Sequence, residues 1–158
     1  EAFTDKTRLT VILNNLISNA IKYHHLDQTE PWIKVKMHNG NQTLSIVVSD
    51  NGPGIDVERQ NKIFDMFYRG TERSKGSGLG LYIVKETIAK MNGTIKVESV
   101  EGKGTSFIVK LPVSSTYNAK EISPAVTHGA VDVVVAHPYA RLRVTQAGPI
   151  VTTRAGAT

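Results

Sequence analysis

Residues 14–23 read Asn14-Asn15-Leu16-Ile17-Ser18-Asn19-Ala20-Ile21-Lys22-Tyr23 and close a helical pattern that begins at Asp5. Apolar residues recur along this pattern at spacings of three and four, which predicts one apolar stripe. Asn15 and Asn19 share a face of the predicted helix. Because asparagine is a mediocre helix former, two of them beside an apolar stripe indicate a function. Their amide oxygens suit Mg²⁺ or its waters, and the Lys22 ammonium suits a phosphate; the alternative is a solvated helix edge.

A second candidate site, Asp50-Asn51-Gly52-Pro53-Gly54-Ile55, directly follows an apolar strand pattern. Its first five residues cannot continue a strand and predict a loop. A carboxylate at a strand end can accept a hydrogen bond from an amine such as that of adenine. The glycines would let a ligand approach the backbone closely. Taken alone, these residues favour an ordinary turn.

A third stretch, Gly76-Ser77-Gly78-Leu79-Gly80-Leu81, opens a second amphipathic helix pattern. A glycine-rich loop that enters a helix offers unpaired N–H groups and the positive end of the helix dipole to a phosphate. The spacing is not that of a P-loop, and the lack of a preceding predicted strand disfavours a Rossmann turn. The alternative is a flexible linker followed by a helix cap.

The order of the predicted elements is a helix, two strands, helices and two strands, without the alternation of a doubly wound fold. It predicts helices on one face of a mixed sheet. Turn signals between paired strand patterns predict two hairpins. The elements are a helix at 5–23, strands at 32–38 and 44–49, one or two short helices at 57–67, a mobile loop at 68–78, a helix at 79–91, and strands at 94–100 and 105–111.

Bulk composition is that of an ordinary globular protein of 158 residues, with 40% hydrophobic and 21% charged residues. The formal charge of +5 comes with no long basic run, so a nucleic-acid surface is not indicated. Cysteine is absent, which excludes disulfides and thiolate metal sites. No apolar run reaches the roughly 20 residues that span a membrane. The chain opens at Glu1 without Met, so we expect it to be a fragment of a longer protein.

Residues 118–158 differ in character from the rest and are rich in Ala, Val, Thr and Gly. Val131 to Ala136 and Arg141 to Thr145 could form strands. We find no chemical motif in this stretch. Added strands, a linker to another domain and vector-derived sequence are all open interpretations, and we expect a domain boundary near residue 117.

Taken in order, these motifs resemble the catalytic domain of histidine kinases, within the group that also holds type II topoisomerase, Hsp90 and mismatch-repair ATPases. The resemblance runs from about Asp5 to Pro112. The F box distinguishes the histidine kinase branch from the topoisomerase and chaperone branches. The matching boxes are the N box at 15–23 (preceded by Asp5-x-x-Arg8-Leu9), the first glycine box at 50–54, the F box at 63–69 (Ile63-Phe64-Asp65-Met66-Phe67-Tyr68-Arg69), the second glycine box at 76–81 and the strand turn at 102–107.

The resemblance implies a role for each matched residue. Asn19 would bind Mg²⁺ with Asn15 beside it, Lys22 would reach a phosphate, Asp50 would bind the adenine amine, and Arg69 would lie near the γ-phosphate. The catalytic residues would be Asn19, Lys22 and Arg69, and the metal ligand Asn19. The ATP-binding residues would be Asn15, Asn19, Lys22, Tyr23, Asp50, Gly52, Gly54, Ile55, Arg69, Gly76, Ser77, Gly78, Leu79, Gly80, Leu81 and Thr105.

The resemblance also implies an α+β fold: a two-layer α/β sandwich whose mixed, mostly antiparallel sheet carries helices on one face. Residues 1–117 would form the catalytic domain of a two-component sensor kinase, with ATP and Mg²⁺ as cofactors. Its partners would be the kinase's own dimerisation and phosphoacceptor domain and a response regulator, with no nucleic acid and no direct membrane contact. The fragment would be cytoplasmic, and the parent a homodimer anchored in the bacterial inner membrane.

Two further functions are alternatives to a histidine kinase. One is a serine/threonine kinase of the anti-sigma type or a slow ATPase, against which the F box argues. The other is a non-catalytic nucleotide-binding module, against which the complete boxes argue. The five histidines lack the acidic residue that normally follows the phosphorylated histidine of this family, so we expect that histidine upstream of Glu1.

Overall fold

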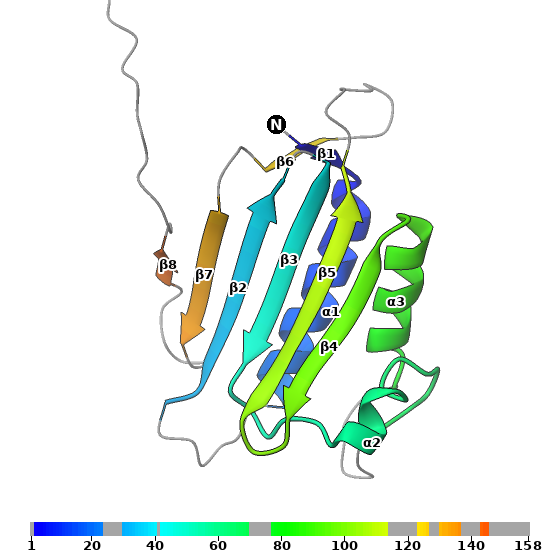
Figure 1. Ribbon diagram of the computed structural model, residues 1–158, viewed down its shortest axis with the longest axis vertical. Helices are drawn as coiled ribbons and strands as arrows, with labels where there is room; N and C mark the ends of the chain where they lie inside the picture. The colour runs from blue at the N-terminus through cyan, green and yellow to red at the C-terminus, as the bar shows by residue number, and fades with distance from the viewer. Residues whose placement is uncertain are drawn as a thin grey trace, which may run out of the picture.

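Two layers make up the molecule, a sheet and a layer of helices on one of its faces (Figure 1). The computed structural model describes residues 2–23, 30–40, 42–69, 77–113, 123–126, 130–136 and 143–145. The elements are β1 (Ala2–Thr4), α1 (Lys6–Lys22), β2 (Trp32–Asn39), β3 (Thr43–Asp50), α2 (Val57–Gln60), α3 (Gly80–Lys90), β4 (Thr94–Val100), β5 (Gly104–Pro112), β6 (Ser123–Val126), β7 (Ala130–Ala136) and β8 (Arg143–Thr145).

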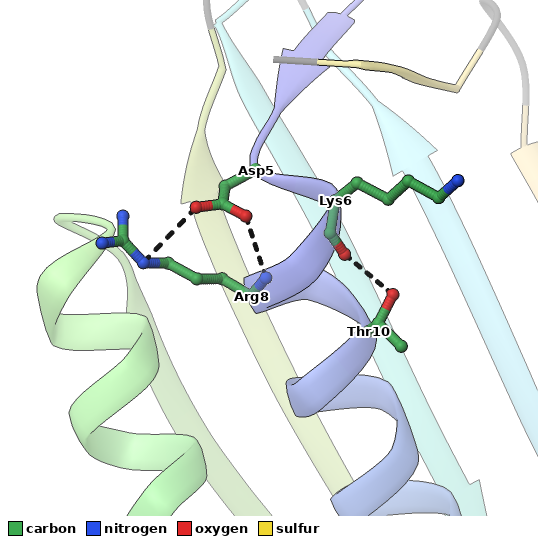
Figure 2. Close-up of polar contacts among 4 residues, drawn as sticks. All are labelled: Asp5, Lys6, Arg8 and Thr10. Atoms are coloured by element: carbon green, nitrogen blue, oxygen red, sulfur yellow. Dashed lines mark hydrogen bonds and ion pairs between the residues drawn. The ribbon is translucent and has the colours of Figure 1, made fainter. Parts of the chain in front are cut away.

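Helix α1 begins at a side-chain cap (Figure 2). The Asp5 carboxylate accepts a hydrogen bond from the Arg8 backbone N–H at 2.9 Å, and the Arg8 Nε lies 3.4 Å from its other oxygen. The Thr10 hydroxyl donates to the Lys6 carbonyl at 2.8 Å. A carboxylate at this position satisfies an otherwise unpaired N–H and opposes the positive end of the helix dipole. The cap therefore fixes where the helix begins.

The main sheet has six strands in the order β4-β5-β3-β2-β7-β8, and every adjacent pair is antiparallel. Both predicted hairpins are confirmed as β2–β3 and β4–β5. The two-layer α+β architecture with helices on one face is confirmed as well. The expected mixed character of the sheet is wrong for the described strands, because every hydrogen-bonded pair is antiparallel. Strand β4 runs in the same direction as β3, but β5 lies between them and pairs with both.

Residues 118–158 contribute three strands. Strand β7 pairs with β2 along its length, and β8 pairs with β7, so both strands suggested from the sequence are observed. Strand β6 pairs with β1 in a separate two-stranded sheet that the sequence did not predict. The boundary near residue 117 stays a prediction, although β7 continues the same sheet.

The core lies between the sheet and the helices. Strand β3 alternates strictly, with Leu44, Ile46 and Val48 buried against the helices. Burying such side chains stabilises the fold by about 1.5–3 kcal/mol each. The buried hydrophobic residues are Leu9, Ile12, Leu16, Ala20, Ile33, Val35, Leu44, Ile46, Val48, Ile63, Val84, Ile88, Phe107, Val109 and Leu111.

The described residues between β3 and α3 are mostly irregular. Of the expected helices at 57–67, only α2 forms, and turns follow it. The expected loop at 68–78 contains no regular element at its described positions 68, 69, 77 and 78, and the rest of it lies outside the described residues. Within the described part of the chain, no helix combines the length and apolar character needed to cross a bilayer.

Candidate nucleotide-binding site

A cavity of about 360 Å³ opens at the end of the sheet where β3 ends and the β4–β5 turn lies. Its volume falls in the range of about 300–1,000 Å³ that is usual for small-molecule sites. Helix α1, the loop after β3, the region after α2 and the β4–β5 hairpin all contribute to its walls. The lining residues are Asn19, Ala20, Tyr23, Asp50, Pro53, Gly54, Ile55, Asp56, Arg59, Ile63, Tyr68, Leu81, Glu101, Thr105 and Phe107.

The cavity brings together part of the set expected from the sequence, drawn from four separate boxes. The expected residues that line it are Asn19, Tyr23, Asp50, Gly54, Ile55, Leu81 and Thr105. The expected residues that do not line it are Asn15, Lys22, Gly52, Arg69, Ser77, Gly78, Leu79 and Gly80. Gly76 lies outside the described residues.

Asp50 occupies the end of β3 inside the cavity. Its carboxylate accepts a hydrogen bond from the Gly52 N–H at 2.9 Å and another from the Thr105 N–H. Burial raises the pKa of Asp50 above its ordinary value of 3.8, and the two backbone hydrogen bonds offset part of that effect. The carboxylate is therefore held in place from the protein side. The cavity side remains available to a donor from a ligand.

This raised pKa predicts how nucleotide affinity responds to acid. If the carboxylate accepts a hydrogen bond from the ligand, affinity should fall as pH falls through the Asp50 pKa, which lies above 3.8. The effect on folding stability has the opposite sign. The native state binds this proton more tightly than the unfolded chain does, because its Asp50 pKa is higher. The contribution of Asp50 to stability therefore decreases as pH rises from 3.8 through the raised pKa. We expect the ratio of the ATP affinities of wild type and Asp50→Asn, measured by calorimetry, to approach one on acidification. A ratio that does not change with pH would contradict a base-binding carboxylate.

The two asparagines of α1 have different surroundings, although both are half-buried. Asn15 donates its side-chain amide to the Val11 carbonyl at 2.8 Å, while Asn19 lines the cavity. Gly80, at the start of α3, lies so close that a Cβ there would be 3.1 Å from the Asn15 Oδ1. The solvated-edge alternative is therefore wrong for this pair. The structure assigns Asn15 to the contact between α1 and α3, and places Asn19 where a ligand can reach it.

Lys22 and Tyr23 lie at the end of α1. The Lys22 Nζ donates to the Tyr23 hydroxyl at 3.1 Å and lies 4.7 Å from the centre of its ring. Tyr23 is 44% exposed and lines the cavity, whereas Lys22 lies on the exposed side. The ammonium is thus held at the rim of the cavity by the ring that forms part of its wall.

The N-terminus of α3 has features that suit an anion. Its N-cap, Leu79, makes no side-chain cap hydrogen bond. The Leu79 N–H donates to the Ser77 hydroxyl at 3.3 Å, and the structure gives the first helical turn no side-chain cap from this N-cap position. Phe67, which precedes the loop at 68–78, lies against Gly78 at the end of that loop. A Cβ on Gly78 would lie 2.7 Å from the Phe67 carbonyl carbon. The two ends of the loop therefore meet beside a helix N-terminus that suits phosphate.

Several lining residues were not identified as ligand contacts from the sequence. Ile63 and Phe107 form the apolar floor, and the ring of Phe64 packs edge-on against Phe107 with centroids 6.3 Å apart. Arg59 and Glu101 add charge at the wall. Ile63 lies in the F box and Phe107 in the strand turn at 102–107. Arg59 and Glu101 lie outside every recognised box, because they meet the cavity through tertiary packing.

No group of three or more His, Cys, Asp or Glu side chains that could hold a metal occurs among the described residues. Asn19 offers a neutral amide oxygen at the cavity wall. Such a donor fits Mg²⁺ that arrives with phosphate oxygens as its main ligands, because Mg²⁺ commonly binds proteins through few side chains. The donor set does not fit a metal bound by protein residues alone.

Comparison with known proteins gives consistent matches. Residues 4–115 match the model of the family described as histidine kinase-, DNA gyrase B-, and HSP90-like ATPase. Sensor protein kinase WalK of Staphylococcus saprophyticus is 41% identical over 112 residues, which cover 68% of this chain and 18% of that relative. A WalK sequence of Staphylococcus aureus is 40% identical over 112 residues, covering 68% and 27% respectively. The chain thus spans a small part of these relatives.

Solved structures show the same likeness. The catalytic domain of histidine kinase ThkA aligns with a TM-score of 0.59 and 33% identity, over 69% of this chain and 69% of that one. The mycobacterial sensor histidine kinase MprB aligns with a TM-score of 0.59 and 28% identity, over 70% of this chain and 73% of that one.

Proposed function

Because the chain belongs to the family of histidine kinase-, DNA gyrase B- and HSP90-like ATPases, as a histidine kinase catalytic domain, we propose that its cavity binds ATP and presents the γ-phosphoryl group to a histidine on a separate segment. One observation supports this most: the cavity has an apolar floor and the half-buried Asp50 carboxylate at its end. An adenine ring fits such surroundings, because it offers a flat apolar face and an amine donor.

The residues around the cavity suggest how the triphosphate would lie. With the base at Asp50, the phosphates would extend past Asn19 towards the uncapped start of α3. Lys22 at the rim and Arg69 at the start of the loop would balance phosphate charge. Mg²⁺ bound with ATP would neutralise charge on the phosphates, and Asn19 would be the protein group that holds it. Phosphoryl transfer depends mainly on such positioning and charge neutralisation.

The transfer step needs an attacking group from another segment. An imidazole nitrogen would attack the γ-phosphorus and form a P–N bond, while the bond from phosphorus to the bridging oxygen breaks and ADP leaves. None of the catalytic roles given to Asn19, Lys22 and Arg69 requires covalent participation by this chain. We therefore expect this chain to bind ATP without phosphorylating itself.

Transfer to a histidine can be tested directly. The chain is mixed with labelled ATP, Mg²⁺ and a histidine-bearing dimerisation domain, and the phosphorylated product is treated with acid. We expect an acid-labile product, as a phosphohistidine requires. An acid-stable product would favour a serine/threonine kinase, and ATP binding without any product would favour a non-catalytic module.

Asn19→Ala tests the residue that would hold Mg²⁺. We expect the rate of Mg²⁺-dependent transfer to fall by roughly 100-fold, a typical loss for one electrostatic group in a transfer site. Asn14→Ala is the matched control, because Asn14 is exposed on the same helix and does not line the cavity. Equal rates in the two variants would show that Asn19 does not hold the metal.

The partners of the parent protein are also part of the proposal. A two-component sensor kinase passes its phosphoryl group to an aspartate on a response regulator, and we propose the same for the protein that contains this domain. We propose further that the parent is a homodimer, and that this domain works on the cytoplasmic side of the membrane that anchors it.

A further inference from the structure

The loop at 51–56 supplies four residues to the cavity and forms neither helix nor strand. Ordering the backbone of such a loop costs about 1–2 kcal/mol per residue, so contacts from outside must hold it. Its N–H and C=O groups show where these contacts come from. The Pro53 carbonyl accepts from the Gly102 N–H at 2.7 Å, and the Ile55 N–H donates to the Ser99 hydroxyl at 2.8 Å. The β4–β5 hairpin therefore holds one side of the loop.

Gln60, the last residue of α2, connects the loop and the hairpin. Its Nε2 donates to the Ile55 carbonyl at 2.9 Å and to the Ser99 carbonyl at 3.0 Å. A primary amide carries two N–H donors on one nitrogen, and here each is used on a different backbone segment. Of the side chains of this size, a glutamate lacks both donors, and a methionine fills the same space with none. The geometry thus requires an amide.

Ser99 continues the connection towards Asp50. Its hydroxyl donates to the Gly104 carbonyl at 2.9 Å and lies 2.9 Å from the Thr105 hydroxyl. Since a hydroxyl has one proton, the Thr105 hydroxyl is the donor in the second contact. The Thr105 N–H in turn donates to the Asp50 carboxylate. Hydrogen bonds therefore link Gln60 to the Ser99 carbonyl, the Ser99 hydroxyl to Thr105, and the Thr105 N–H to the carboxylate, with the backbone of Ser99 and Thr105 joining the steps.

We infer that Gln60 is a positioning residue for recognition of the nucleotide base: its two hydrogen bonds hold the 51–56 loop against β4, and so fix the distance between Ile55 and Asp50 across the base. Gln60 itself does not line the cavity, so it acts through its neighbours. This inference rests on the proposed ATP site. It concerns the base end of the cavity only, because none of these hydrogen bonds involves α1 or the start of α3.

The test compares the ATP and GTP affinities of wild type and Gln60→Met by calorimetry in the presence of Mg²⁺. Loss of two neutral hydrogen bonds should weaken ATP binding by roughly 5- to 20-fold. GTP, whose base offers an oxygen where adenine has its amine, should lose much less, so the preference for ATP should fall by a similar factor. Gln42→Met, an exposed site at the far end of the β2–β3 hairpin, is the matched control and should bind like wild type.

Each outcome decides the inference. Equal losses for ATP and GTP, or a lower melting temperature with unchanged affinities, would overturn it and leave Gln60 as a stabilising residue only. If Gln60→Met fails to fold, Gln60→Ala replaces it, because it also removes both donors, with the same expected loss of preference. If wild type binds no ATP, or Asp50→Asn binds as wild type does, the proposed site is wrong and this inference fails with it. Loss in Asp50→Asn but not in the Gln60 variants would overturn the inference alone.

Discussion

Asp50→Asn should weaken ATP binding by roughly 10- to 150-fold, because a hydrogen bond to a charged group contributes about 1.5–3 kcal/mol. The substitution keeps the size and shape of the side chain. It replaces a carboxylate that accepts hydrogen bonds from Gly52 and Thr105, and in our proposal from the adenine amine, with an amide that has one acceptor and two donors. Calorimetric titration with ATP and Mg²⁺ measures the change directly.

Glu86→Gln is the matched control for that experiment. It makes the same chemical change at an exposed position of α3 that does not line the cavity. Its affinity should equal that of wild type. If both variants bind ATP like wild type, Asp50 does not contact the base; if both bind equally weakly, the loss in Asp50→Asn does not report a specific contact.

Gly104→Ala should destabilise the fold by about 3–5 kcal/mol, the sum of backbone strain and steric overlap. Gly104 has a φ of +120°, where side chains are strongly disfavoured. A Cβ there would overlap the Asp50 carbonyl oxygen and lie 2.8 Å from the Asn51 Cα. These atoms are backbone and cannot rotate away, so β3 and β5 would have to separate at the cavity. Urea unfolding measures the loss of stability.

Gly102→Ala gives the control on the same turn. Gly102 also has a positive φ, of +77°, but no atom lies within 4 Å of the position of its Cβ. Only backbone strain should remain, which costs about 1–2 kcal/mol. ATP binding by the folded protein should survive in this variant and be lost in Gly104→Ala. Similar stabilities for the two variants would show that the turn adapts and that its tight contact with Asp50 is not required.

Much of the fold could be predicted because its signals are local. The stripe of α1, its Asp5 cap and the alternation of β3 each follow from residues close together in the chain. The pairing of β1 with β6 could not be predicted, because a three-residue strand such as Ala2–Thr4 shows too little alternation to stand out. The purely antiparallel sheet was missed for a related reason, since strand direction between distant segments is not encoded in either segment alone.

The candidate site also combines residues that local motifs predict with residues that only tertiary contacts bring in. Asp50 and Asn19 lay in ordered motifs, and the cavity contains both. Gln60, Ser99 and Phe107 were not identified as part of the site, because their contacts depend on the sheet being assembled. For Asn15, a helix position shared with Asn19 suggested a ligand; its amide donates to Val11 and its Oδ1 lies near Gly80, and its contact with a nucleotide stays a prediction. Sequence spacing placed it on the correct face without showing what that face meets.

The hydrogen bonds between the 51–56 loop and β4 also bear on how the protein folds. The Ile55–Ser99 bond joins residues 44 positions apart, and the Gln60–Ser99 bond joins residues 39 apart. Contacts of such long sequence separation form late, because the entropy of closing the intervening chain must be overcome first. A chain still emerging from the ribosome would hold α1 and the β2–β3 hairpin well before it had a base pocket. Nucleotide should therefore bind only chains that have completed β5, and its presence should slow unfolding of the finished domain without accelerating its formation.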